Sequence, residues 1–517
     1  MALDRSPLSS LGLLTELIDL GDERLNARTL QMLETCLGSA KSTLTAMFGE
    51  SKGEQKGSQR LLSNERVDPI ALRELAYAAA LHRIEAESVK RVVCAYDPTL
   101  LDFSMQNGKQ ERMPIGDGGG MGYVWLNAAI IEPRSKRLMG VLHQTVVSKA
   151  GPDDAHCIDY APGVRNKTDR KRMTRSPANQ FLTITNAVDA RVPAGVEVVH
   201  VADREFDDGL ALRSRRKSKA SRFVIRGNDN RVVQVHAEEW LPAELHKPVS
   251  SKQIDPTPSG LINVHLKDLV RLLPICHQQT LLVDRRGRVC PNPENAARSI
   301  SLSIGAIAIR LGRMSKRGEE LHLQEEPIWL NLVVARESSP APGKKPVQWL
   351  LLTDLPAGTN ADLDDVIHAY SCRWRIEEFF RTVKDGMRLE DSELDDPWST
   401  ARLLFFITLR AAFLDELRAR AEIAAGTPPT KQQRRDLVQG AQRAIEIEHA
   451  RLTLGTPPPH LTTRERARMA LGLVARRGRW TVQAGVSLGN YVLLSGLHIV
   501  LHDLAEGRFT WLLDDVG

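Results

Sequence analysis

Residues 196–203 read VEVVHVAD and residues 91–98 read RVVCAYDP. Both stretches are rich in β-branched and apolar residues, as buried strands are, and they arrive at Asp203 and at Asp97. Between them, residues 181–188 have the apolar spacing of a helix. Strands that alternate with helices predict an α/β fold, in which strand ends are where functional sites form.

The rest of the chain divides by its apolar pattern. Residues 1–75 are expected to be helical, with a flexible connector at residues 52–58 (KGEQKGS). Residues 222–355 carry short apolar runs separated by Pro and Gly, which predicts a mostly β section inserted in the α/β core. From residue 362 onward the apolar spacing is helical again.

Composition and charge exclude several classes of protein. The chain has 517 residues, too many for one compact domain, and 42% of them are apolar, enough for real cores. No apolar run approaches the ~20 residues that span a bilayer, and the N-terminus lacks a signal-peptide pattern, so we expect a cytoplasmic protein. Six cysteines without a CxxC pair predict reduced thiols rather than a zinc site. A net charge of +6 does not by itself identify a nucleic-acid binder.

Residues 365–389, which include YSCRWRIEEFF, predict an amphipathic helix. Its apolar stripe would face a core, and polar residues would form an arc on the opposite side. Glu378 lies outside that polar arc. A solvated face with ion pairs is the ordinary interpretation, but aromatic side chains are less expected on such a face. Arg, Tyr and Lys bind phosphates and Glu binds hard metal ions, so a functional face is the alternative. At about 100° per residue, one arc of similar width holds Tyr370, Arg373, Trp374, Glu377, Arg381 and Lys384.

Asp97 and Asp203 are candidates to join Glu377 in a metal site. Carboxylates from two strands and a helix can converge on two divalent ions, which activate the nucleophile and stabilise the leaving oxygen in phosphoryl transfer. Taken singly, each aspartate is more often a turn residue or a helix N-cap. The alternative carboxylates nearby are Asp102, Asp207 and Asp208.

Three basic segments agree with a polyanionic partner. Residues 165–175, 213–226 and 464–479 each hold at least six Lys and Arg side chains and no more than one acidic residue among them. One such cluster is more often a solvated face, but three suggest contacts to a nucleic-acid backbone.

Several common catalytic motifs are missing. The sequence has no P-loop, no GxSxG and no HExxH. Residues 116–122 (GDGGGMG) look like a cofactor loop, but Met121 occupies the third glycine position and the segment precedes a strand. We therefore expect a strand-entry loop rather than a phosphate cradle.

The spacing from Tyr370 to Lys384 resembles the Y-(2)-R-(3)-E-(6)-K signature of cut-and-paste insertion-sequence transposases of the DDE type. Residues 201–205 (VADRE) are similar to the second-aspartate motif of that family, and residues 347–353 (VQWLLLT) to the strand before its signature helix. Residues 21–25 resemble the start of its DNA-end-binding domain, and the C-terminal part resembles its helical dimerisation domain more faintly. The resemblance thus covers most of the chain in order.

This resemblance implies an RNase H-like core. Asp97, Asp203 and Glu377 would be the catalytic triad and would hold two Mg²⁺ or Mn²⁺ ions. One departure is Pro98, where relatives often have a polar residue; it would alter backbone contacts beside Asp97 without removing the carboxylate.

The resemblance also implies a set of DNA contacts. Tyr370, Arg373 and Lys384 of the signature helix would bind phosphates near the transposon end. Arg226 of the β section would contact DNA. Trp374 or Trp349 would stack on, or beside, a base flipped out as a DNA hairpin forms.

The function implied is DNA transposition by a homodimer in a synaptic complex. The protein would bind transposon ends in double-stranded DNA, cleave them and join the 3′ ends to target DNA. One alternative is an RNase H-like nuclease without strand transfer, and another is a transposase-derived DNA-binding regulator. The expected segments are a helical DNA-end-binding domain (1–75), the first part of the RNase H-like core (76–220), a mostly β insertion (221–355), the signature helix of the core (356–395) and a helical C-terminal domain for dimerisation (396–517).

Overall fold

The computed structural model describes most of the chain, in ranges separated by gaps. The described residues are 9–38, 47–48, 51–116, 119–149, 177–217, 221–238, 241–242, 258–283, 298–312, 327–340, 343, 346–425, 431–462, 465–466, 469–470, 472–474, 500 and 508–512. The basic segment at 165–175 and most arginines of the segment at 464–479 lie outside them.

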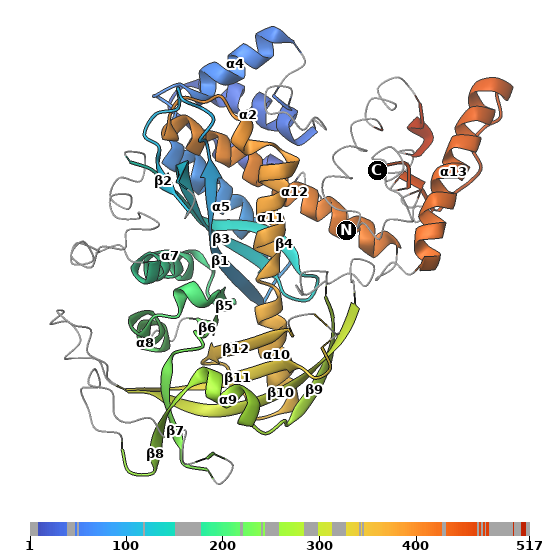
Figure 1. Ribbon diagram of the computed structural model, residues 1–517. Coiled ribbons are helices and arrows are strands. Elements are labelled where there is room, and N and C mark those ends of the chain that lie inside the picture. Colours follow the sequence, from blue (N-terminus) through green and yellow to red (C-terminus); the bar gives the residue numbers. More distant parts are fainter. Residues whose placement is uncertain are drawn as a thin grey trace.

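One mixed sheet runs through the described part of the chain (Figure 1). Its order is β2-β3-β1-β5-β6-β12-β11-β10-β7-β8, with β4 paired to β3 and β9 paired to β10. The β1–β5 and β5–β6 pairs are parallel, and the other pairs are antiparallel. The mixed α/β class agrees with the prediction. The strands are β1 (Arg91–Asp102), β2 (Met113–Ile115), β3 (Gly120–Glu132), β4 (Arg137–Val147), β5 (Glu197–Ala202), β6 (Arg222–Arg226), β7 (Val232–His236), β8 (Leu261–His265), β9 (His277–Val283), β10 (Arg298–Leu311), β11 (Ile328–Glu337) and β12 (Gln348–Thr353).

Strand β1 extends further than the sequence suggested. We expected it to end at Asp97, but β3 pairs with it as far as Asp102, which lies opposite Gly122. A side chain at Gly122 would place its Cβ 1.9 Å from the Leu101 carbonyl oxygen, so the close approach of these strands requires glycine. Asp97 therefore lies inside a strand. Past Ala95, β1 pairs on one side only, which accommodates the missing N–H of a proline.

Helices cover both faces of the parallel strands (Figure 1). Tyr96 of β1 packs against Phe181 of α7 (Pro177–Arg191), with 5.3 Å between ring centroids. On the opposite face, Trp125 of β3 packs against Phe379 of α11 (Trp374–Arg381), with 5.4 Å between ring centroids. Alternating side chains thus give each face its own helical cover. The α7 face also carries α8 (Gly209–Lys217), and the α11 face carries α10 (Asn360–Ser371) and α12 (Pro397–Ala425).

The helix predicted over residues 365–389 is broken in the structure. α10 and α11 are separate helices, and a π-helical turn over Thr382–Gly386 follows α11. At the break, the Arg373 N–H donates to the Tyr370 carbonyl, three residues back instead of four. Cys372 and Arg373, the two residues between the helices, both keep right-handed helical dihedrals, so the break is a tightened turn.

The N-terminal helices share one apolar core with the sheet and α12. Arg410 of α12 donates to the Cys36 carbonyl of α2 (Glu23–Gly38), and Arg402 donates to the Leu62 carbonyl at the end of α4 (Lys52–Leu62). The predicted flexible connector at residues 52–58 is wrong, because Ser51 forms a capping box that starts α4 there. The remaining helices of this part are α1 (Ser9–Leu17) and α5 (Pro69–Ala86).

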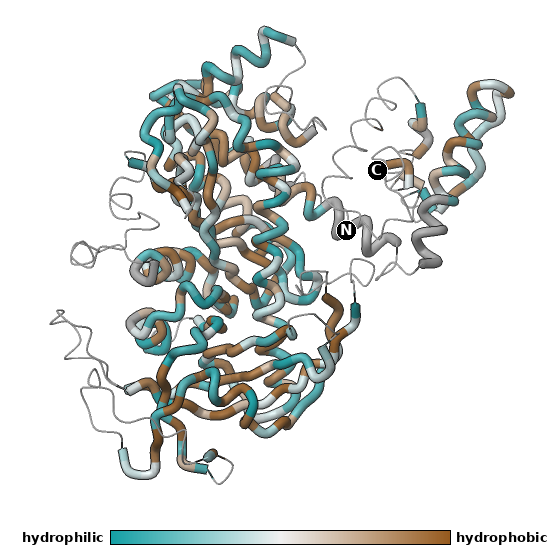
Figure 2. The backbone as a smooth tube through the Cα atoms, viewed as in Figure 1, coloured by the Kyte–Doolittle hydropathy of each residue, from teal (hydrophilic) through white to brown (hydrophobic). Residues whose placement is uncertain are grey.

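The section from residue 221 to residue 355 is mostly β, as predicted, and it continues the central sheet. Its first strand, β6, pairs parallel with β5, with Val224 opposite Val201, and β12 then pairs antiparallel with β6, so the section extends the sheet beyond β5. Its described part also holds the short helix α9 (Leu266–Leu272). Figure 2 shows the hydrophobic segments concentrated along the strands and hydrophilic ones on outer helices and turns. The division into five segments stays a prediction.

A second, smaller apolar cluster lies near the C-terminus. It includes Ala441 of α13 (Lys431–Leu454) together with Leu461 and Leu512. Figure 1 shows α13 to one side of the sheet, beyond the end of α12. Among the helices of the described ranges, none combines the length and the apolar character needed to cross a membrane.

Candidate active site

Asp97 and Asp203 lie at matching positions on neighbouring parallel strands. Ala95 of β1 pairs with Val201 of β5, and each aspartate lies two residues further along its own chain segment. Because side chains alternate along strands, Asp97 shares the face of Ala95, and Asp203 continues that of Val201. Tyr96, which lies between Ala95 and Asp97 in the sequence, points to α7 on the other face of the sheet. The two aspartates therefore lie on the face that α11 covers.

The carboxyl group of Asp97 lies in a strongly negative environment. The pKa of Asp97 is raised to about 7, chiefly by burial; the Arg373 guanidinium acts to lower it, and the carboxylates of Glu377, Asp203 and Glu205 act to raise it. The pKa of Glu205 is also raised, first by burial and then by Asp203. Four carboxyl groups therefore lie close enough to interact, and such a group favours a cation.

Glu377 reaches this place from α11, and Arg373 lies between it and Asp97. The Arg373 Nη2 donates to Glu377 Oε1 at 2.7 Å, and Nη1 lies 3.6 Å from Asp97 Oδ2. The side chain of Arg373 is 4% exposed, and its Nε has no hydrogen-bond partner within the described ranges. One guanidinium thus neutralises part of the charge of two carboxylates.

The aromatic residues predicted to contact DNA lie beside this arginine. The Tyr370 ring packs edge-on against Trp349 at 5.4 Å and against Trp374 at 6.2 Å between centroids. The Arg373 guanidinium carbon lies 4.0 Å from the Trp374 ring centroid. Tyr370 and Trp349 are buried, and Trp374 is half-buried. The interpretation of this face as solvated is therefore wrong for Tyr370 and Arg373, because both side chains are buried against the sheet.

The other two predicted DNA contacts lie on different sides of the site. Lys384 donates to the Leu100 carbonyl at 2.7 Å and pairs with Glu390 at 3.0 Å. Arg226 is half-buried and donates to the Gln348 carbonyl at 3.3 Å. Lys384 therefore contacts β1, the strand of the first aspartate, whereas Arg226 lies two strands away on β6.

The carboxylates have the chemistry of a site for Mg²⁺ or Mn²⁺, but they do not surround one point. Oxygen ligands from Asp and Glu suit both ions. In the described part of the chain, no three His, Cys, Asp or Glu side chains are grouped as ligands of one ion. Instead, Asp97 and Glu377 are both directed to Arg373. The donor set fits a divalent ion once these side chains turn away from the arginine.

The alternative carboxylates have structural contacts of their own. Asp102 accepts a hydrogen bond from the Ser104 N–H in the turn after β1. Asp207 is buried and pairs with Arg231 at 2.5 Å. Asp208 accepts from the backbone in the first turn of α8. These contacts are those of turn and cap residues, and they distinguish the three from Asp97.

Part of the basic segment at 213–226 is structural. Arg215 is buried and its guanidinium pairs with Asp189 of α7, while the buried Arg213 donates to the Gly312 carbonyl. Our interpretation of the whole segment as a DNA-facing surface is therefore wrong for these two residues. The charge count along the sequence missed their partners, because those partners are distant in sequence. Among the described residues of the segment, the exposed cations are Arg216, Lys217 and Arg222.

Two residues of this site had no predicted role. Asn127 of β3 lies directly opposite Asp97, is fully buried, and has no partner for either amide atom within the described residues. Cross-strand partners lie on the same face, so Asn127 borders the aspartate. Glu205 follows Asp203 in a 3-10 turn over Arg204–Phe206. The signal for Asn127 is a polar residue inside an apolar strand, and for Glu205 its place two residues after an aspartate.

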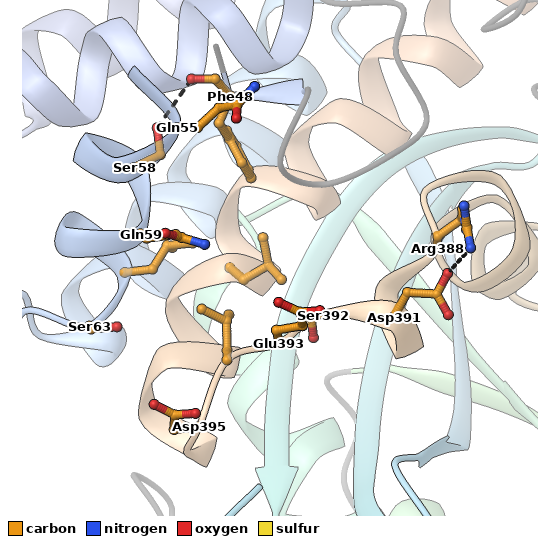
Figure 3. A pocket seen from close by; sticks show the side chains of 13 residues that line it. Phe48, Gln55, Ser58, Gln59, Ser63, Arg388, Asp391, Ser392, Glu393 and Asp395 are labelled. Atoms are coloured by element: carbon orange, nitrogen blue, oxygen red, sulfur yellow. Dashed lines mark hydrogen bonds and ion pairs between the residues drawn. The ribbon is translucent and has the colours of Figure 1, made fainter. Parts of the chain in front are cut away.

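A separate cavity of about 460 Å³ lies between α4 and the segment after the π-helical turn (Figure 3). Arg388 pairs with Asp391 across part of its rim at 2.5 Å, and Ser58 donates to the Phe48 carbonyl at 3.1 Å on the α4 side. None of the predicted catalytic or DNA-binding residues lines it.

A comparison with protein families connects this site to a known domain. Residues 172–414 match the family described as "Transposase DDE domain". The matched range includes Asp203, Glu377 and the elements from β5 to α11, whereas Asp97 precedes it. The mixed sheet with helices on both faces is consistent with such a domain. The DDE resemblance seen in the sequence is thus confirmed over residues 172–414, which match a transposase DDE domain.

Proposed function

We propose that the protein is a metal-dependent DNA transposase that cleaves transposon ends and joins their 3′ ends to target DNA. The observation that carries this proposal is the register of β1 and β5, which sets Asp97 beside Asp203 on the face where α11 supplies Glu377. Together with the match to a transposase DDE domain, this arrangement supports a catalytic triad of these three carboxylates.

Asp97, Asp203 and Glu377 would hold the divalent ions. Bound Mg²⁺ or Mn²⁺, two ions in our proposal, would activate the nucleophile and stabilise the leaving oxygen. Strands β1 and β5 position the two aspartates, and α11 positions Glu377. The sheet thus orients the reacting phosphate and the helix completes the site.

Cationic side chains around the triad would bind the DNA backbone. Arg373 and Lys384 lie on either end of α11 and its π-helical turn, and Arg226 lies on β6. Tyr370 lies beside Arg373, with 6.0 Å between its ring centroid and the guanidinium carbon, and its buried hydroxyl interacts with the arginine. A phosphate near the transposon end would satisfy these groups.

We further propose that cleavage proceeds through a DNA hairpin. Water cuts one strand at the transposon end, the freed 3′-hydroxyl attacks the opposite strand, and water reopens the hairpin before joining to the target. Trp374 is half-buried and can reach a flipped base, whereas Trp349 is buried beneath Tyr370. The base-stacking role therefore goes to Trp374, and Trp349 serves it through packing.

The remaining parts of the proposal concern organisation. The strands β4, β3, β1 and β5 would belong to an RNase H-like core, with residues 221–355, which hold the strands from β6 to β12, as the insertion. The N-terminal helices would bind transposon ends, and the C-terminal helices would hold a homodimer in a synaptic complex. We expect the protein to act in the cytoplasm, where it binds double-stranded DNA.

The test is incubation of the purified protein with its own element ends, Mg²⁺ and a target plasmid. We expect nicked ends, hairpins and joined products with wild-type protein, and none of them with Asp203→Asn. Nicking without joining would instead indicate an RNase H-like nuclease, and end binding without cutting would indicate a regulator. The match to a transposase DDE domain favours neither alternative.

A further inference from the structure

We propose that Arg373 occupies the cation position of the triad in the resting protein and leaves it when DNA binds. This inference rests on the proposed function and adds a regulatory role for one residue. Its guanidinium lies 2.7 Å from Glu377 Oε1 and 3.6 Å from Asp97 Oδ2, between two carboxylates that would otherwise face a metal ion.

The surroundings of Arg373 show that this position is not its only favourable one. Its Nε has no hydrogen-bond partner in the described part of the chain, although the side chain is almost fully buried. An unpaired buried donor is costly, so a position that satisfies it would compete with the present one. A phosphate oxygen, which accepts from several nitrogens of one guanidinium, would provide that position.

An aromatic ring beside Arg373 provides a surface along which its side chain can move. Arg373 lies in the two-residue break between α10 and α11, where its N–H bonds three residues back. The Trp374 ring, 4.0 Å away, gives the guanidinium a flat apolar surface along which it can turn while it stays stacked. The ring itself need not move for the exchange.

The consequence is coupling between DNA and metal binding. While Arg373 bridges Asp97 and Glu377, a divalent ion must displace a cation to enter. Once a DNA phosphate draws the guanidinium away, both carboxylates become available to the ion. Coupling between two binding sites is reciprocal, so metal must strengthen DNA binding by the same factor as DNA strengthens metal binding. The full protein would then load metal chiefly when DNA is in place.

The experiment measures Mn²⁺ binding by the electron paramagnetic resonance signal of free Mn²⁺, using the full chain with and without DNA. The duplex ends at the last transposon base pair, so it lacks the phosphate to be cut. For wild-type protein we expect DNA to tighten Mn²⁺ binding by roughly 5–150-fold. Arg373→Gln should bind Mn²⁺ without DNA about as tightly as wild type does with DNA, and its coupling factor should fall to near one.

Arg381→Gln is the matched control, because it removes one charge from an exposed position of the same helix. It should keep the wild-type affinity and coupling. The proposal is overturned if Arg373→Gln binds Mn²⁺ no more tightly than wild type, or if it keeps the wild-type coupling. It is equally overturned if Arg381→Gln reproduces the effect, since general charge would then explain it.

Two further measurements keep the test decisive. If Arg373→Gln does not fold, the wild-type protein alone suffices: its DNA affinity must rise with Mn²⁺ by the same factor, and an unchanged affinity overturns the proposal. Asp97→Asn separates this proposal from the proposed function. Mn²⁺ binding that ignores Asp97 contradicts the metal triad itself, whereas binding that needs Asp97 but ignores Arg373 contradicts only the exchange.

Discussion

Arg373 and Arg375 are two residues apart and both are buried beside carboxylates, yet their surroundings differ. Arg375 pairs with Glu378 on its own helix and with Asp415 of α12, and Asp415 also accepts from the Leu138 N–H of β4. Those groups satisfy one another within the fold. Arg373 instead faces several carboxylates, whose combined negative charge exceeds its single positive charge.

This difference teaches how to tell a structural ion pair from a candidate site. A buried pair by itself is weak support for either stability or function. The Arg375 pairs join α11, α12 and β4, three elements that must pack together. The Arg373 pairs join a strand to a helix where acidic groups outnumber basic ones, so the excess negative charge indicates a position for a cation.

The largest expected effect separates the two neighbouring glutamates of α11. Glu377→Gln removes a proposed metal ligand and should reduce cleavage by about 10³-fold or more, because metal ions supply several kcal/mol of transition-state stabilisation. Glu378→Gln, the matched control, alters the Arg375 side and should keep cleavage within about tenfold of wild type. A time course of cut transposon ends measures both. Loss of activity in Glu378→Gln alone would falsify our assignment of the helix faces.

The next effect concerns stability on the structural side. Asp415→Ala leaves the buried Arg375 short of one carboxylate and the Leu138 N–H without its acceptor, so we expect a loss of about 3–5 kcal/mol in the free energy of unfolding. Urea denaturation followed by circular dichroism measures it. Arg381→Ala on the exposed side should change stability by no more than about 0.5 kcal/mol. A loss below about 1 kcal/mol in Asp415→Ala would contradict the structural role.

A smaller effect depends on pH and concerns Asp97 in the candidate active site. The folded pKa of Asp97 is about 7 against an ordinary 3.8, so the folded protein holds this proton more tightly than the unfolded chain does. The resulting stabilisation is complete below about pH 4 and is lost as the pH rises to about 7. With a chelator present, Asp97→Asn should gain roughly 1–3 kcal/mol relative to wild type between pH 5 and pH 8. If the two proteins instead show parallel curves of stability against pH, the pKa of Asp97 is not raised in the folded protein.

The smallest expected effect is kinetic and concerns Trp374. An aromatic face offsets ~1–3 kcal/mol of base unstacking, so Trp374→Ala should slow hairpin closure about tenfold while first-strand nicking stays close to normal. The buried Trp349 provides the contrast. Trp349→Ala should lower the free energy of unfolding by about 3–5 kcal/mol, and nicking and hairpin closure should be lost together. A time course of nicked and hairpin products, beside melting curves, measures these outcomes. Equal slowing of both steps in a stable Trp374→Ala would remove the base-stacking role.

Several features could be predicted from sequence because they depend on neighbours along the chain. The β-branched runs before Asp97 and Asp203 predicted β1 and β5, and the composition of residues 222–355 predicted strands. The spacing of Arg373 and Glu377 predicted a shared helix face, which their 2.7 Å contact shows. The boundaries were less accurate, since the helix break and the extension of β1 depend on contacts with other strands and helices.

Local sequence thus determined which segments are strands or helices, and which acidic and aromatic residues were worth attention. Only the tertiary structure decided that Asp97 and Asp203 stand in register, because strand pairing joins residues about a hundred positions apart. It also decided that Arg215 is buried against Asp189 rather than exposed to DNA, and that Arg373 lies between two carboxylates. The physical reason is the same in each case: burial and charge pairing depend on what the fold places opposite a side chain, and that partner comes from a distant part of the sequence.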